Sequence, residues 1–121
     1  MPRIYHLTTA HAWAAAQNGG SYGESTRGPS LAEVGFIHCS YAHQVTRVAA
    51  ARYSDAAGLV LLVIDPDRLR AELRDEDLDG RGEVFPHIYG PLNLDAVVEV
   101  LPFGPAEDGN FALPAGLGAE T

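Results

Sequence analysis

GFIHCS, residues 35–40, places a histidine and a serine among apolar neighbours, directly before a helical segment that begins at Tyr41. A buried imidazole needs hydrogen-bond partners or a chemical role. Two other short apolar segments share this feature, IYHLTT at residues 4–9 and FPHIYG at residues 85–90. We therefore expect His6, His38 and His87 to meet in one cleft.

The composition limits the classes of protein to which the chain can belong. Its 121 residues suffice for a single domain, which we expect over residues 1–103, and segment 104–121 lacks periodicity and indicates a loose C-terminal tail. The formal net charge is −8 and there is no lysine, so we expect no nucleic acid and no anionic membrane as partner. A small-molecule or protein partner fits better. The oligomeric state does not follow from the sequence.

The single cysteine, Cys39, rules out an internal disulfide. The N-terminus shows no apolar signal run, and no apolar run approaches the roughly 20 residues of a membrane helix. These features predict a cytoplasmic protein. Cys39 and His38 are adjacent in a strand and point to opposite faces, so we expect Cys39 to be a small buried hydrophobe and not a nucleophile.

Short strands and two helical segments predict an α+β domain. The run at 58–65 is apolar on both faces, which is typical of a central strand, whereas the charged segment 72–82 predicts a weak edge strand or hairpin. Pro86 predicts an edge or a bulge for the strand that contains it. In all we expect strands at residues 3–8, 36–39, 58–65, 85–89 and 96–103.

Helical spacing predicts one helix at 10–17, capped by Thr9, with Trp13 as its core anchor, and another at 41–53, capped by Ser40. Between them, residues 19–29 are polar and rich in glycine, and Tyr22 and Arg27 are their only large side chains. This loop is either a binding loop or a plain surface connection.

Each of the three histidines also has a structural explanation, in which backbone or water satisfies its ring. The neighbouring Thr8, Ser40 and Tyr89 favour a site instead. Three imidazoles would suit zinc with an open fourth position, so a zinc hydrolase using His6, His38 and His87 is an alternative. No HExxH or paired Cys/His motif supports it, and we assign no metal ligand.

Glu83 is the carboxylate that we expect beside the histidines. It precedes Phe85 by two positions and His87 by four, so a continuous strand would carry all three on one face. Neither a complete GxGxxG motif before a helix nor a GxxxxGK[ST] motif occurs, which excludes Rossmann and P-loop cofactor sites.

Four blocks, in order, resemble the signature blocks of an uncharacterised bacterial family known as domain of unknown function 952. They are IYHLTT at 4–9, GFIHCS at 35–40, LLVIDP at 61–66 and FPHIYGPL at 85–92. The resemblance extends over about residues 3–103. It implies a family without an assigned activity.

Residues 5–8 and 37–40 also resemble the paired histidine segments of the ADP-ribosyltransferase fold, in the branch of the tRNA 2'-phosphotransferases. That resemblance implies a strongly bent or split sheet that grips NAD, in which His6 holds the adenosine ribose and His38 with Ser40 lines the nicotinamide side. The phosphotransferases clamp phosphates with several arginines, one of them shortly after the first histidine. Here no arginine lies between Arg3 and Arg27, so RNA phosphate transfer is not expected.

The sequence therefore predicts a compact α+β domain with a strongly bent or split mixed sheet and two main helices. Its ligand would be NAD or an ADP-ribose compound, bound as a substrate and not as a tightly held cofactor. Whether the domain is an ADP-ribosyltransferase-like enzyme or a non-catalytic ligand-sensing or protein-interaction module stays open. The residues expected to act in catalysis are His38, Glu83 and His87, and those expected to bind the ligand are His6, Thr8, Tyr22, Arg27, Ser40 and Tyr89.

Overall fold

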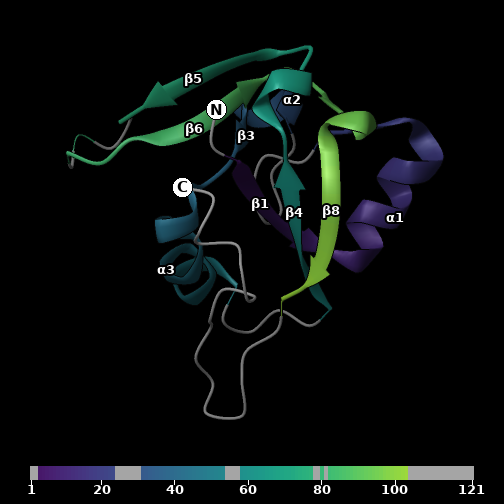
Figure 1. Ribbon diagram of the computed structural model, residues 1–121, viewed down its shortest axis with the longest axis horizontal. Coiled ribbons are helices and arrows are strands. Elements are labelled where there is room, and N and C mark those ends of the chain that lie inside the picture. Colours follow the sequence, from purple (N-terminus) through teal and green to yellow (C-terminus); the bar gives the residue numbers. More distant parts are fainter. Residues whose placement is uncertain (1–2, 24–30, 54–57, 78–79, 81, 104–121) are drawn as a thin grey trace.

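The computed structural model describes residues 3–23, 31–53, 58–77, 80 and 82–103 (Figure 1). Within them the helices are α1 (Ala10–Gly19), α2 (Leu31–Val34) and α3 (Ala42–Arg52), with short 3-10 turns η1 (Pro66–Arg68) and η2 (Leu94–Ala96). The strands are β1 (Ile4–Thr9), β2 (Ser21–Tyr22), β3 (Ile37–His38), β4 (Leu59–Ile64), β5 (Glu72–Glu76), β6 (Phe85–Tyr89), β7 (Leu92–Asn93) and β8 (Val97–Pro102).

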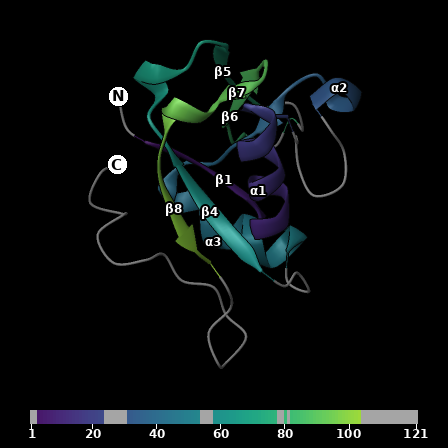
Figure 2. The ribbon, with the colours of Figure 1, turned by 90° about the vertical axis from the view of Figure 1, so that its right-hand side faces the viewer.

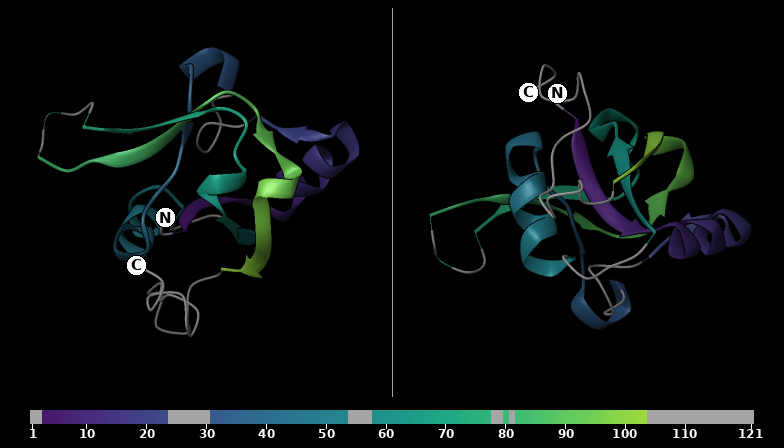
Figure 3. Two further views of the ribbon diagram at one scale, coloured as in Figure 1. Left: turned by 45° about the horizontal axis from the view of Figure 1, so that its top comes forward. Right: turned by 90° about the horizontal axis from the view of Figure 1, so that it is seen from below.

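The first sheet has the order β1-β4-β8, and β4 lies at its centre, as its apolar run predicts. Alternate residues of β4 enter two cores, because successive side chains of a strand point to opposite faces. Leu62 belongs to the core that contains Trp13 of α1, and Leu61 belongs to the core that contains Val45 of α3. The two helices accordingly lie on opposite sides of this sheet (Figures 1 and 3).

The second sheet has the order β3-β6-β5, so β6 is its middle strand and not the edge or bulge that Pro86 predicts. The backbone N–H of Cys39 donates to the Pro86 carbonyl at 3.0 Å, and proline has no N–H with which to return the bond. Proline is thus tolerated because β3 ends at His38, where the regular ladder stops. β5 is an edge strand, as its charges predict.

The two larger sheets are joined at one bridge. Tyr5 of β1 and Ser40 exchange backbone hydrogen bonds of 2.8 Å and 2.7 Å, just after β3 ends. Ser40 was expected to cap α3, and this prediction is wrong, because Ser40 takes part in the bridge to Tyr5. The N-cap of α3 is Tyr41, whose N–H donates to Gln44 Oε1 at 2.9 Å. Thr9 caps α1 as expected, because its Oγ1 accepts the Ala12 N–H at 3.1 Å.

Part of the expected loop at 19–29 forms a third, two-stranded sheet. Ser21 and Tyr22 of β2 pair with Asn93 and Leu92 of β7. β7 lies next to β6 in Figure 2. Gly20 ends α1 with φ 90°, a left-handed conformation that suits glycine. Arg27 and the expected tail, residues 104–121, lie outside the described residues.

The α+β class, the split sheet and the two main helices are confirmed. The pairings differ from the expected mixed sheet, since each pair of described strands is antiparallel. In the part of the chain that the structure describes, no helix has both the length and the apolar character needed to cross a membrane.

Candidate functional site

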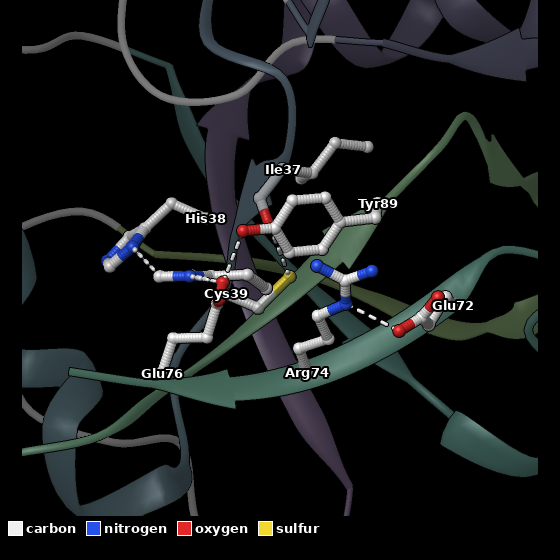
Figure 4. Close-up of polar contacts among 8 residues, drawn as sticks. Ile37, His38, Cys39, Glu72, Arg74, Glu76 and Tyr89 are labelled. Carbon is white, nitrogen blue, oxygen red and sulfur yellow. Dashed lines mark hydrogen bonds and ion pairs between the residues drawn. The ribbon is translucent and has the colours of Figure 1, made fainter. Parts of the chain in front are cut away.

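The register of the second sheet sorts its side chains onto two faces, since residues directly opposite each other share a face. Ile37 pairs with Ile88, and both are fully buried on the inner face. His38 pairs with His87, which in turn pairs with Arg74 across β6 and β5. Alternation along the three strands gives the outer face Phe36, His38, Glu72, Arg74, Glu76, Phe85, His87 and Tyr89. Figure 4 labels His38, Glu72, Arg74, Glu76 and Tyr89 of this face.

A chain of hydrogen bonds runs across this outer face from a carboxylate through two imidazoles. Glu76 Oε1 lies 3.1 Å from His87 Nδ1, and His87 Nε2 lies 3.3 Å from His38 Nδ1. The Tyr89 hydroxyl donates to the same oxygen of Glu76. Glu76, His87 and His38 thus form a continuous proton path, which we call the relay.

The charge on Glu76 decides which atom donates and which accepts in each hydrogen bond of the relay. The hydrogen bond from Tyr89, and then that from His87, lower the pKa of Glu76 below its usual value, so the carboxylate is ionised and only accepts. His87 therefore donates from Nδ1, and a neutral His87 accepts from His38 at Nε2. In a neutral His38 that donates from Nδ1, the remaining lone pair is on Nε2. Nε2 of a neutral His38 is thus an acceptor, on the side of the ring away from His87.

Aromatic rings enclose the relay. Phe36 stacks on His87 with centroids 4.2 Å apart, and Phe85 lies 5.0 Å from the His38 ring. The Arg74 guanidinium covers the Tyr89 ring at 4.4 Å. His87 is buried, with 4% of its surface exposed, whereas His38 and the three aromatic side chains are half-buried. The relay therefore meets the surface at its two ends, His38 and Glu76, and is buried at His87 between them.

His6 occupies a different place, beneath this face. Its Nδ1 donates to the backbone carbonyl of His38 at 2.6 Å, and its Nε2 lies 2.7 Å from the Tyr22 hydroxyl, which contacts Thr8 Oγ1 at 2.9 Å. Burial lowers the pKa of His6 to about 4, although the bond to His38 opposes this. The ring is thus neutral at pH 7, and its Nδ1 carries the hydrogen that the His38 carbonyl accepts. Of the three histidines, only His38 and His87 have their rings in contact.

Glu83 is not the carboxylate beside the histidines. It forms an ion pair with Arg47 and accepts a hydrogen bond from Gln44 Nε2 at 3.1 Å. β6 begins only at Phe85, so the strand alternation cannot be extended back to Glu83. Glu76 takes that place, because the antiparallel register sets it opposite Phe85. A sequence signal could have identified Glu76: the patterns ELRDE and FPHIY stand on either side of the dipeptide Asp79-Gly80, which is typical of a hairpin turn.

Thr8, Tyr22 and Ser40, which were expected to bind the ligand, are buried. Ser40 and Thr8 are 4% and 3% exposed, and Ser40 contributes its backbone to the bridge with Tyr5. Cys39 is fully buried and burial strongly raises the pKa of its thiol, which confirms it as a small buried hydrophobe. Among the described residues, no three His, Cys, Asp or Glu side chains are grouped so as to hold a metal ion.

Comparison with known proteins identifies relatives without an assigned function. The chain resembles protein CC0527 from Caulobacter crescentus: its crystal structure superposes with a TM-score of 0.79 at 31% identity, covering 96% of this chain and 98% of the other. The solution NMR structure of CC0527 gives a TM-score of 0.66 at 30% identity, covering 91% of each chain. No curated protein matches. The family model described as "Protein of unknown function (DUF952)" matches residues 7–100, and the chain therefore belongs to that family.

Proposed function

We propose that the chain binds NAD or a related ADP-ribose compound on the outer face of the β3-β6-β5 sheet and cleaves or transfers its ribosyl group. The observation that carries this proposal is the relay from Glu76 through His87 to His38. An ionised carboxylate behind two hydrogen-bonded imidazoles is an arrangement that delivers a base to a partly exposed position. The ligand class comes from the resemblance of residues 5–8 and 37–40 to the ADP-ribosyltransferase fold.

The reaction would use the two ends of the relay differently. The bond between ribose C1' and the nicotinamide nitrogen breaks, and its electron pair leaves with nicotinamide. The acceptor oxygen forms a bond to C1', and its proton passes to His38 Nε2. The negative charge of Glu76 stabilises the resulting imidazolium through His87 and favours the oxocarbenium-like centre. Glu76 thereby takes the role first expected of Glu83.

The aromatic frame offers surfaces for the rings of such a ligand. Phe36, Phe85 and Tyr89 are half-buried around the relay, and aromatic side chains stack on nicotinamide or adenine at low entropic cost. His6 would support the site from beneath, since it holds the carbonyl of His38. A direct contact between His6 and a ribose would require its bond to Tyr22 to open.

The test is Glu76→Gln, which keeps the size of the side chain and removes its charge. Loss of the base's charged partner should lower NAD turnover by about a hundredfold. Glu99→Gln is the matched control, because it removes an exposed carboxylate on β8, in the other three-stranded sheet, and leaves the relay intact. Wild-type protein that neither binds NAD nor turns it over, or equal turnover in wild type and Glu76→Gln, would refute the proposal.

A non-catalytic ligand-sensing module is the second candidate, and the charge of the outer face favours it. Among the described residues of this face, Arg74 is the one arginine, and its Nε donates to Glu72. A pyrophosphate would therefore meet few cations. Imidazole resonances of His38 and His87 that shift on addition of adenosine or nicotinamide, which carry no pyrophosphate, while NAD is neither bound nor cleaved, would identify the sensing module.

A further inference from the structure

Gln44 is a buried side chain in the first turn of α3 whose amide is fully engaged. It is 1% exposed, and its Oε1 accepts from the Tyr41 N–H at 2.9 Å. Its Nε2 donates to the Val84 carbonyl at 2.8 Å and to Glu83 Oε2 at 3.1 Å. An amide nitrogen has two hydrogens, so both are used. Gln44 therefore fixes the start of β6 against the start of α3.

Two neighbours on the same helix end hold the same hairpin. The Tyr41 hydroxyl donates to Asp75 on β5, and the Arg47 guanidinium pairs with Glu83. We call Tyr41, Gln44 and Arg47 the helix clamp. The β5–β6 hairpin extends from the body of the protein, with α3 beneath it (Figure 1). The clamp thus binds β5 and the residues that lead into β6, in a hairpin that projects from the fold.

The relay depends on this attachment because its members belong to two different segments. Glu76 and His87 lie on the hairpin, whereas His38 lies on β3, two residues before Ser40, which is bonded to Tyr5. The ladder that joins β3 to β6 has only two residue pairs. So short a ladder gives little resistance to a rotation of the hairpin, which would separate His38 Nδ1 from His87 Nε2.

We propose that the helix clamp is a positioning device for the relay and that Gln44 is its central positioning residue. The inference rests on the proposed function in treating the relay as the reactive group. Gln44 touches no reacting atom. Its amide nitrogen holds the hairpin in place and so determines the position of His87 relative to His38. Its Oε1 caps α3, the helix that follows His38.

The decisive variant is Gln44→Glu. The carboxylate still accepts the Tyr41 N–H and has the same size, but it cannot donate to Val84 and it repels Glu83. The readout is the nitrogen–nitrogen coupling across the His38–His87 hydrogen bond in protein labelled with nitrogen-15, together with NAD turnover. We expect the coupling to be present in the wild type and lost in Gln44→Glu, and turnover to fall at least tenfold.

Tyr53→Phe is the matched control. It removes a buried hydroxyl that donates to the Leu7 carbonyl at 3.2 Å, next to the other end of α3, so it weakens packing without touching the clamp. It should keep both coupling and turnover. If Gln44→Glu does not fold, Tyr41→Phe replaces it, since that change removes only the hydroxyl bound to Asp75; a weaker coupling is expected.

The outcomes separate the two proposals. Coupling and turnover that persist in Gln44→Glu or, where that variant does not fold, in Tyr41→Phe would overturn the positioning role and leave the proposed function standing. A relay that stays coupled in wild-type protein without any NAD turnover would overturn the proposed function alone. Absence of the coupling in wild-type protein would overturn both.

Discussion

Each of the two three-stranded sheets has one apolar face, and they differ in the side chains on the other face. In the β1-β4-β8 sheet both faces of the central strand are apolar, and Leu61 and Leu62 enter separate cores. In the β3-β6-β5 sheet the central strand has one apolar face, and its other face carries ionisable groups and aromatic rings. The β1-β4-β8 sheet stabilises the fold by burying apolar side chains on both faces. The β3-β6-β5 sheet buries one face and holds polar groups at fixed positions on the other.

The same difference separates two histidines. His6 lies on the first sheet, where its ring is buried and bonded on both nitrogens by the protein itself. His38 lies on the second sheet at a half-buried end of the relay. A histidine between apolar neighbours is thus a structural element in one sheet and a reactive candidate in the other.

The largest expected effect is on stability and comes from the first sheet. Leu62→Ala should lower the free energy of unfolding by about 3 kcal/mol, because it opens a cavity at a fully buried position. Trp13, the single tryptophan, reports unfolding in urea by fluorescence. Val98→Ala, at a position 39% exposed, should change stability by less than about 0.5 kcal/mol. Equal losses would contradict the assignment of stability to the β4 core.

The next effect is the pH dependence that His6 confers. Burial lowers its pKa from 6.5 to about 4, so between these values the unfolded chain binds more protons than the folded one. The contribution of neutral His6 to the free energy of unfolding is therefore complete above pH 6.5. As the pH falls towards 4, the free energy of unfolding decreases by about 3 kcal/mol.

The measurement compares urea unfolding of wild type and His6→Asn between pH 7 and pH 4. Asparagine keeps a donor for the His38 carbonyl but does not titrate, so the stability advantage of the wild type should shrink as the pH falls. His11→Asn is the matched control, since that ring is exposed on α1. A constant difference between wild type and His6→Asn across this range would show that His6 is not buried in neutral form.

The smallest effect concerns the edge of the outer face. Tyr89→Phe removes one of the donors to Glu76 and keeps the aromatic ring beside Phe36. We expect NAD turnover to fall by about threefold to tenfold, since His87 still holds the carboxylate. Thermal unfolding should change little. A loss as large as that of Glu76→Gln would mean that Tyr89 itself takes part in the chemistry.

Much of the fold could be predicted because it depends on local pattern. Thr9 before an apolar helix, the apolar run of β4 and the charges of β5 identified a cap, a central strand and an edge strand. Pro86 misled the prediction, because its missing N–H faces the place where β3 has ended. Ser40 misled it as well, since the bridge to Tyr5 uses its backbone and α3 begins one residue later.

The candidate site could be predicted in part. His38, His87 and Tyr89 come together as expected, whereas the carboxylate beside them is Glu76 and not Glu83. Alternation within one segment was enough to place His87 and Tyr89 on one face. It could not place Glu76, which lies on another strand and reaches His87 only through the register of the hairpin.

By itself, the sequence determined where the main strands and the two main helices lie, which of their faces are apolar, and that Cys39 is buried, since these follow from the spacing of neighbouring side chains. Only the tertiary structure decided which polar groups meet. His38 lies 49 positions from His87 and His6 lies 32 positions from His38, so their hydrogen bonds depend on how distant segments pack. That packing separates a relay that reaches the surface from a histidine that is held within the protein.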